Sequence, residues 1–135
     1  MRPLLLAVVI AVAAVPAGTA GAALPGFQTP SGNIHCAGYG GEVRCDIMAT
    51  SNGHPMRPAS CQLDWGTAYA AKRSWSRGRR LCVGDTVNDP SHRGLAYGRA
   101  WTYAGVTCTS RFSGLTCRTR AGHGFFLSKA RQRLF

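Results

Sequence analysis

The sequence predicts a small all-β domain, a disulfide-stapled antiparallel sandwich or barrel of about six to eight short strands. Three observations predict this fold class. Six cysteines follow an apolar N-terminal segment, apolar and polar residues alternate with the period of a half-buried strand, and one cysteine-containing hairpin pattern occurs twice. No linker divides the rest of the chain, so we expect one all-β domain over residues 23–135.

The N-terminus has the pattern of a cleaved signal peptide over residues 1–22. Arg2 precedes an apolar run from Leu4 to Val15, and Ala20-Gly21-Ala22 fits the small-residue cleavage pattern. The run is shorter than the roughly 20 apolar residues that a membrane span needs. We therefore expect a protein that is secreted, or associated with the cell wall, and has no membrane span after cleavage. We also expect a monomer.

The repeated pattern consists of two short strands, each with one cysteine, around a tight turn. It covers residues 33–47 and again 105–119, and one offset of 72 residues aligns the two copies. Under this offset Val43 falls on Leu115. The repeat predicts two similar hairpins in a pseudo-twofold arrangement.

Six cysteines in an exported chain predict three disulfides. Eight residues separate the two cysteines of each hairpin, and a directly opposed cross-strand pair lies within disulfide reach. The hairpins therefore predict the bonds Cys36–Cys45 and Cys108–Cys117, which leaves Cys61 and Cys82 for the third. Each bond contributes roughly 2.5–3.5 kcal/mol in the chain-entropy account, so reduction is expected to be severely destabilising.

The remaining segments complete the expected β domain. Turn residues mark loops over 51–58 and 85–93. Residues 63–69 alternate like a strand, and Gly66 and the aromatic residues disfavour the helix that the neighbouring alanines would suit. Four further elements are expected, namely a partner strand at 79–83, a β region from Leu95, a strand at Phe125–Leu127, and one helical turn from Ser128 to Phe135.

Positive charge is the main expected surface property. Without Arg2 the chain has 15 basic and 5 acidic residues, which favours anionic partners, although a GC-rich genome also favours arginine. The run Lys72–Arg80 has five cationic residues among nine. We predict that Arg77, Arg79 and Arg80 contact phosphates or carboxylates. Trp75 then stacks on a ring or packs nearby. The alternative is a solvated hairpin tip with the tryptophan folded onto the sheet.

An ordered set of motifs extends over about Phe27 to Phe135. The motifs are Pro30-Ser31-Gly32-Asn33-Ile34, Val43-Arg44-Cys45-Asp46-Ile47, Asp64-Trp65-Gly66, Cys82-Val83-Gly84-Asp85-Thr86, Tyr97-Gly98, Gly114-Leu115-Thr116-Cys117 and Gly122-His123-Gly124-Phe125. This set resembles a domain-of-unknown-function family of small proteins exported by actinobacteria. The resemblance implies an exported, disulfide-bearing domain without an assigned activity, and it brings no catalytic residues. The basic run 72–80 is more basic than the family pattern.

The residue types predict neither a metal site nor a catalytic site. The chain has no H-x3-H or C-x2-C spacing, no G-x-S-x-G motif, and no odd cysteine that would remain as a free thiol. We therefore expect a non-catalytic binding or structural module without metal or cofactor. Its expected partner is an anionic polymer or a protein at the cell envelope, with no specific nucleic acid.

Two alternatives remain open. A secreted hydrolase, acting on RNA or a wall polymer, would use His123 or His35 with Glu42 and an arginine. A secreted protease inhibitor would present a rigid loop such as Tyr39–Glu42 or Arg111–Gly114. An enzyme needs a pocket that joins a histidine to a carboxylate or cation, a polymer binder needs a continuous positive face, and an inhibitor needs a protruding loop.

Overall fold

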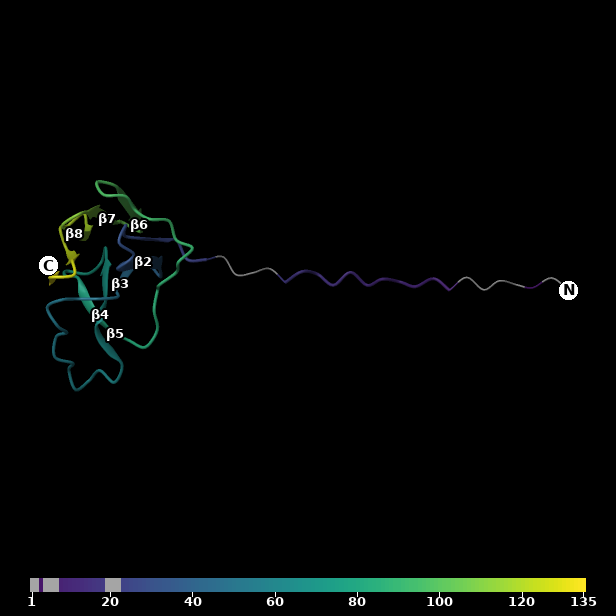
Figure 1. Ribbon diagram of the computed structural model, residues 1–135, viewed down its shortest axis with the longest axis horizontal. Helices are drawn as coiled ribbons and strands as arrows, with labels where there is room; N and C mark the ends of the chain where they lie inside the picture. The colour runs from purple at the N-terminus through teal and green to yellow at the C-terminus, as the bar shows by residue number, and fades with distance from the viewer. Residues whose placement is uncertain (1–2, 4–7, 19–22) are drawn as a thin grey trace.

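The structure is a computed structural model that describes residues 3, 8–18 and 23–135. These residues form ten strands and no helix, which confirms the predicted all-β class (Figure 1). The predicted cleavage motif at residues 20–22 lies outside the described residues. Residues 8–18 are exposed and carry no regular structure. Across the described ranges no helix has the length and apolar character that a membrane span requires.

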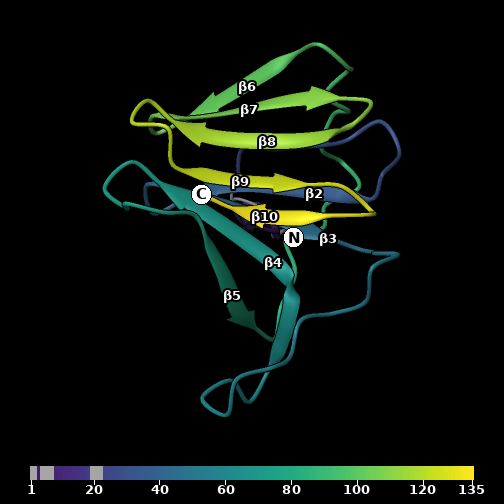
Figure 2. The same ribbon diagram turned by 90° about the vertical axis from the view of Figure 1, so that its left-hand side faces the viewer.

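The strands form two antiparallel five-stranded sheets. The N-terminal sheet has the order β1 (Gly26–Gln28), β2 (Ile34–Tyr39), β3 (Glu42–Ile47), β4 (Asp64–Lys72), β5 (Arg79–Val83). The C-terminal sheet has the order β10 (Gln132–Leu134), β9 (Gly124–Leu127), β8 (Gly114–Thr119), β7 (Val106–Arg111), β6 (Ala100–Tyr103). Figure 2 shows the C-terminal sheet in green to yellow, in front of β2 and β3. The described strands therefore make a sandwich of two open sheets, and the barrel alternative is not observed.

The two sheets repeat one arrangement, as the sequence offset predicted. β7 and β8 lie 72 residues after β2 and β3, with the same lengths. In both sheets the cysteine hairpin is flanked by one strand before it and two strands after it. The predicted pseudo-twofold arrangement is thus a pair of five-stranded meanders.

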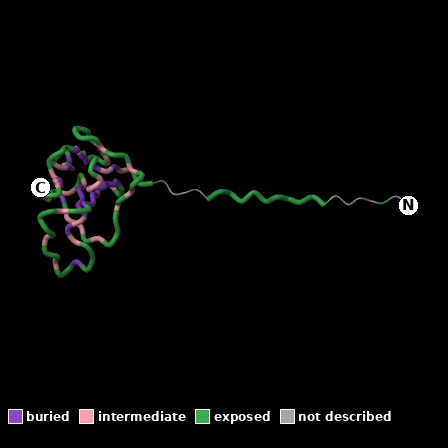
Figure 3. Tube along the Cα trace, viewed as in Figure 1, coloured by how far each residue is buried: buried purple, intermediate pink, exposed green. Residues whose placement is uncertain are grey.

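The core contains one row of residues from each sheet, and the two rows face each other. Strand register defines the rows as Phe27, Cys36, Cys45, Tyr69 and Trp101, Cys108, Cys117, Phe125. Equivalent members touch, with ring centroids 5.1 Å apart for Phe27–Trp101 and 6.2 Å for Tyr69–Phe125. The Sγ atoms of Cys45 and Cys117 are 3.8 Å apart. The two hairpin disulfides therefore pack on each other in the core. Figure 3 shows the buried parts of the chain in purple inside the domain.

All three predicted disulfides are present. Cys36–Cys45 and Cys108–Cys117 link directly opposed residues of their hairpins, and their four cysteines are fully buried. The third bond joins Cys61, in the loop before β4, to the exposed Cys82 of the edge strand β5.

Mild reduction of the folded protein should open Cys61–Cys82 before the other two bonds. A reducing thiolate has to reach a disulfide sulfur, and among the six cysteines only Cys82 is exposed. Alkylation and mass mapping at increasing reductant concentration, without denaturant, checks this order. In denaturant the preference should disappear, and equal reactivity of all three bonds in the folded state would contradict the prediction.

Several local expectations need correction. Residues 128–135 do not form a helical turn, because a tight turn at Ser128–Arg131 reverses the chain into β10. The last β region begins at Ala100 rather than Leu95. The strand assignment around Gly66 is confirmed, with a register irregularity between Trp65 and Ala68. Ten strands rather than six to eight are found, partly because β1 and β10 are three-residue edge strands.

A crossover segment covers the outer face of the N-terminal sheet. Residues 84–93, here called the strap, follow β5 and cross to the opposite edge strand β1, where Gln28 N donates to Arg93 O at 3.0 Å. Beneath the strap the outward residues of β2 and β4 include the buried Ala37, Ala68 and Ala70. These small side chains leave room for the strap to pack on the sheet.

Candidate functional site

The outer face of the C-terminal sheet is open, cationic and rich in threonine. Strand alternation turns Cys108, Cys117 and Phe125 inward and the intervening residues outward. We call this surface the arginine–threonine face, which consists of Thr107, Thr109, Arg111, Thr116, Arg118, Arg120, Arg131 and Arg133. Its five arginines are all exposed. A shallow depression of about 650 Å³ runs over it from Gly105 to Arg120.

No aspartate or glutamate side chain lies on this face. The five acidic residues of the chain all precede Pro90, whereas residues 90–135 carry eight basic residues and no acidic one. Among the described residues, the side chains of the five arginines form no ion pair and no intramolecular hydrogen bond. Their guanidinium N–H donors therefore remain available for an external anion.

Aromatic rings on the same face are covered by these arginines. The guanidinium carbon of Arg131 lies 5.2 Å from the ring centroid of Phe126. Arg118 and Arg133 lie 5.0 Å and 5.3 Å from the centroid of Phe135. Cation–π contact at these distances holds the guanidinium groups in place over the sheet. Three of the five guanidinium groups are thus restrained over the sheet, whereas Arg111 and Arg120 have no such contact among the described residues.

The predicted basic loop Lys72–Arg80 does not direct its arginines to one surface. Arg79 lies on Trp75, with the guanidinium carbon 4.0 Å from the ring centroid. Arg80, next in β5, turns to the opposite face and donates through Nε to the hydroxyl of Tyr69 at 3.4 Å. Arg77 donates to a backbone carbonyl of β10 at 3.2 Å. An anion site made of these three arginines and the tryptophan remains a prediction.

A second feature is a pocket of about 530 Å³ between the strap and the N-terminal sheet. The almost completely buried Arg44 lies at its base. Its Nε and Nη2 donate to both carboxylate oxygens of Asp46 at 2.9 Å and 3.1 Å. Its Nη1 donates to the Asp85 carboxylate at 2.7 Å, and Nη2 donates to the Asp85 carbonyl at 2.9 Å. Asp46 also accepts from Val87 N at 3.0 Å, so this cluster fastens the strap to β3.

The ionic contacts in this cluster shift the pKa values of Arg44 and Asp85. Burial alone would lower the pKa of Arg44, but hydrogen bonds with Asp46 and Asp85 and the charge of Asp46 raise it above its ordinary value. The hydrogen bond from Arg44, followed by its charge, lowers the pKa of Asp85. Since this folded-state pKa is depressed, the contact stabilises fully above about pH 4 and is lost as the pH falls through the lowered value.

The same pocket brings a histidine near acidic groups. His92 Nε2 lies 3.6 Å from Asp89 and binds the Leu24 carbonyl at 2.8 Å. Its Nδ1 is buried without a partner in the described structure. The pocket therefore joins a histidine to a carboxylate, as the hydrolase alternative requires. However, Arg44 is already bound by two carboxylates, and the remaining imidazole nitrogen is not accessible to a substrate.

Of the two histidines that the hydrolase alternative combined with Glu42, His35 is not brought near it, and the combination with His123 remains a prediction. His35 pairs with Asp46 near one end of the β2–β3 hairpin, while Glu42 pairs with Tyr39 beside the turn. At about 3.3 Å per residue these positions are roughly 13 Å apart along the strand. His35 Nε2 binds the Gly32 carbonyl at 2.9 Å, which is a structural role.

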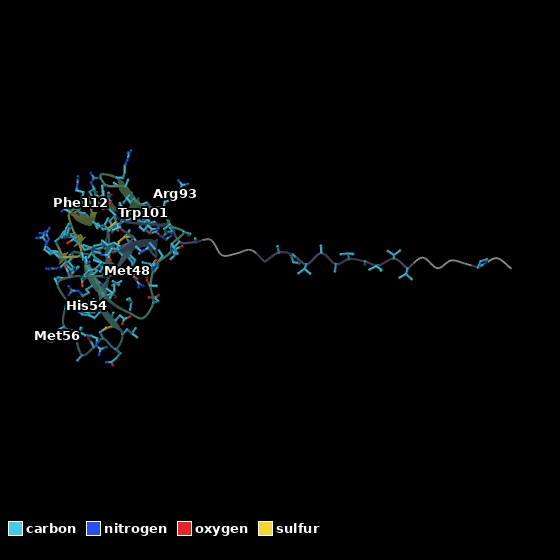
Figure 4. The ribbon with its side chains drawn as sticks, viewed as in Figure 1. Met48, His54, Met56, Arg93, Trp101 and Phe112 are labelled. Carbon is cyan, nitrogen blue, oxygen red and sulfur yellow. A yellow bond between two sulfur atoms is a disulfide. The ribbon has the colours of Figure 1, made fainter. Side chains whose placement is uncertain are left out.

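One of the two candidate inhibitor loops has a strongly exposed aromatic tip. The β7–β8 turn has Phe112 and Ser113 at its tip, and the phenylalanine is 89% exposed at the periphery of the domain (Figure 4). Gly114 closes this turn with a φ of +148°, and a Cβ there would meet the Phe126 ring and the Leu127 carbonyl. The Tyr39–Glu42 turn has two glycines at its tip and a tyrosine that is 37% exposed.

These features define a class, a duplicated β sandwich with two hairpin disulfides in its core and one uncovered cationic sheet face. The chain belongs to the family of unknown function DUF6636, whose model matches residues 4–135. This family membership confirms the expected resemblance to a family without an assigned activity. Neither a curated protein nor a solved structure matches the chain.

Proposed function

We propose that the protein is a non-catalytic module that binds an anionic polymer at the cell envelope through its arginine–threonine face. The proposal rests on one observation: that face has five exposed arginines and no aspartate or glutamate side chain. The equivalent face of the other sheet is covered by the strap, whereas no segment of the described residues covers this one. Three disulfides are consistent with an extracellular protein.

The geometry suits repeated anionic groups along a chain. Arginine binds carboxylates and phosphates through charge-assisted hydrogen bonds, and threonine hydroxyls between the arginines add neutral donors and acceptors. Because the guanidinium groups of Arg118, Arg131 and Arg133 already lie over aromatic rings, these three side chains lose less conformational freedom on binding. Affinity should fall as salt concentration rises, since binding releases counterions from the polymer.

Replacing Arg118 and Arg120 together by Ser should weaken binding of poly-L-glutamate by about tenfold or more. Each lost arginine–carboxylate contact removes about 1 kcal/mol of binding free energy. It also reduces the slope of log K against log salt concentration by about one. The measurement is titration of the polymer at several salt concentrations between about 50 and 200 mM. A matched control replaces the exposed Arg57 and Arg93, which lie off the face, and changes the net charge equally.

A third double variant, Arg77→Ser with Arg79→Ser, separates this face from the basic loop. If the loop variant loses binding and the face variant does not, the polymer binds at residues 72–80 instead. If all three variants lose affinity equally, the interaction depends on net charge alone. No binding by the unmodified protein at low salt would remove the proposal.

A further inference from the structure

A cavity of about 440 Å³ lies at the end of the sandwich where the β7–β8 turn meets two other turns. Phe112 and Ser113 line one side, and the turn before β2 and the turn after β9 line the others. Its volume lies in the range of small-molecule and cofactor sites. The further residues used below are Tyr97, Arg111 and Lys129, which also line it.

The cavity presents an aromatic pair at its rim. The rings of Tyr97 and Phe112 meet edge to face with centroids 5.8 Å apart. Tyr97 is 48% exposed and Phe112 is 89% exposed. A strongly exposed phenylalanine on a short turn has no role in the core, and its ring is therefore free to pack against a ligand in the cavity.

The charge of the cavity matches that of the arginine–threonine face. Arg111 and Lys129 line it, and no carboxylate does. Arg111 also lines the depression over β7 and β8, so the cavity and the face are continuous. A polymer that lies along the face therefore reaches the cavity at the Phe112 end.

The rings of the face argue against a nucleic acid as that polymer. Single-stranded nucleic acids bind through successive bases that stack on uncovered aromatic rings. Here Phe126 and Phe135 are covered by arginines, and the positions between the arginines are threonines. The rings of Tyr97 and Phe112 at the cavity are not covered by arginines. Ser113, which carries a hydroxyl group, lines the same cavity. An apolar ring face, hydroxyl partners and cations together suit a hydroxylated ring that carries an acidic group.

We propose that this cavity binds one sugar ring of an acidic polysaccharide, packed on Phe112, with an acidic group of that sugar contacting Arg111 or Lys129. The following sugars lie along the arginine–threonine face. This inference rests on the proposed function and narrows its polymer to an acidic polysaccharide.

The test compares three polyanions, namely an oligouronate with one carboxylate per sugar, poly-L-glutamate and an oligothymidylate. The variants are Phe112→Ser, the conservative Phe112→Tyr, and Met56→Ser as a control at a residue that is 93% exposed and lies away from Phe112 in Figure 4. We expect Phe112→Ser to weaken oligouronate binding by about tenfold, since packing of one aromatic side chain is lost. Poly-L-glutamate binding and the salt slope should change less than about twofold. Phe112→Tyr should retain binding.

The outcomes separate the two proposals. If the unmodified protein binds none of the polyanions, the proposed function fails. If it binds poly-L-glutamate but Phe112→Ser leaves oligouronate binding unchanged, only the cavity assignment fails. If Phe112→Ser weakens the oligothymidylate more than the oligouronate, the ring stacks on a base and the polymer is a nucleic acid.

Discussion

The double variant Cys36→Ala/Cys45→Ala should lower the free energy of unfolding by about 4–5 kcal/mol. Loop entropy accounts for about 2.6 kcal/mol, because the two positions are nine apart in the sequence. The two lost sulfur atoms add about 1 kcal/mol each, since both cysteines are fully buried and Cys45 Sγ lies 3.8 Å from Cys117 Sγ. Urea denaturation monitored by tryptophan fluorescence measures the change.

The matched control for this prediction is Cys61→Ala/Cys82→Ala. Its longer separation of 21 residues raises the entropic contribution to about 3.4 kcal/mol. It opens a smaller cavity, because Cys82 is exposed and only Cys61 is buried. The hairpin variant should therefore be the less stable of the two, although its loop is shorter. The reverse order would show that loop entropy alone governs stability and that the packed sulfur atoms contribute nothing.

The variant Arg44→Met should lower the free energy of unfolding by about 3–5 kcal/mol. Removing the guanidinium leaves the carboxylate of Asp46, which is 3% exposed, with a single backbone donor from Val87. Removing one partner of a buried ion pair is strongly destabilising, because the remaining charge stays buried without compensation. The strap should also loosen, because Asp85 loses both of its contacts with Arg44. Hydrogen exchange of the strap amides and chemical denaturation measure the two effects.

Restoring neutrality should recover most of this loss. The variant Arg44→Met/Asp46→Leu removes both charges together. Replacing a buried ion pair by apolar groups of similar size often leaves the free energy of unfolding unchanged. Arg93→Met, at an exposed position, is the control for a lost surface charge. If the double variant is as unstable as Arg44→Met, the destabilisation comes from packing rather than from the unpaired carboxylate.

The duplicated hairpins share their inner faces and differ on their outer faces. Outward residues Arg44 and Asp46 of the first hairpin correspond to Thr116 and Arg118 of the second. The first pair is buried beneath the strap, whereas Arg118 is exposed. One half of the molecule thus uses its arginine to hold a covering segment, while the other half presents its arginine to solvent.

The sequence by itself determined the class of fold, the two hairpins and the disulfide partners. These depend on local relations, since alternation at period two assigns a strand face and the spacing within each hairpin brings opposed cysteines together. The same local reasoning misplaced the C-terminal segment, because Ser128 can cap a helix or close a tight turn. Pairing with β9 decides between them.

Only the tertiary structure decided which charges act together. The density of basic residues in the run 72–80 predicted an anion site there. In the structure, alternation along β5 places Arg79 and Arg80 on opposite faces of the strand. The arginine–threonine face collects residues from β7, β8 and β10 and from two turns. The signal for it was the lack of acidic residues after Asp89. Whether a sheet face is open or covered depends on where a distant segment crosses it. The strap is held on its sheet by the contact between Arg44 and Asp85, which are 41 positions apart in the sequence. Such long-range packing leaves no periodic pattern in the chain. The sequence therefore predicted the all-β class and its hairpins, whereas the arrangement of charges on the surface depends on the tertiary fold.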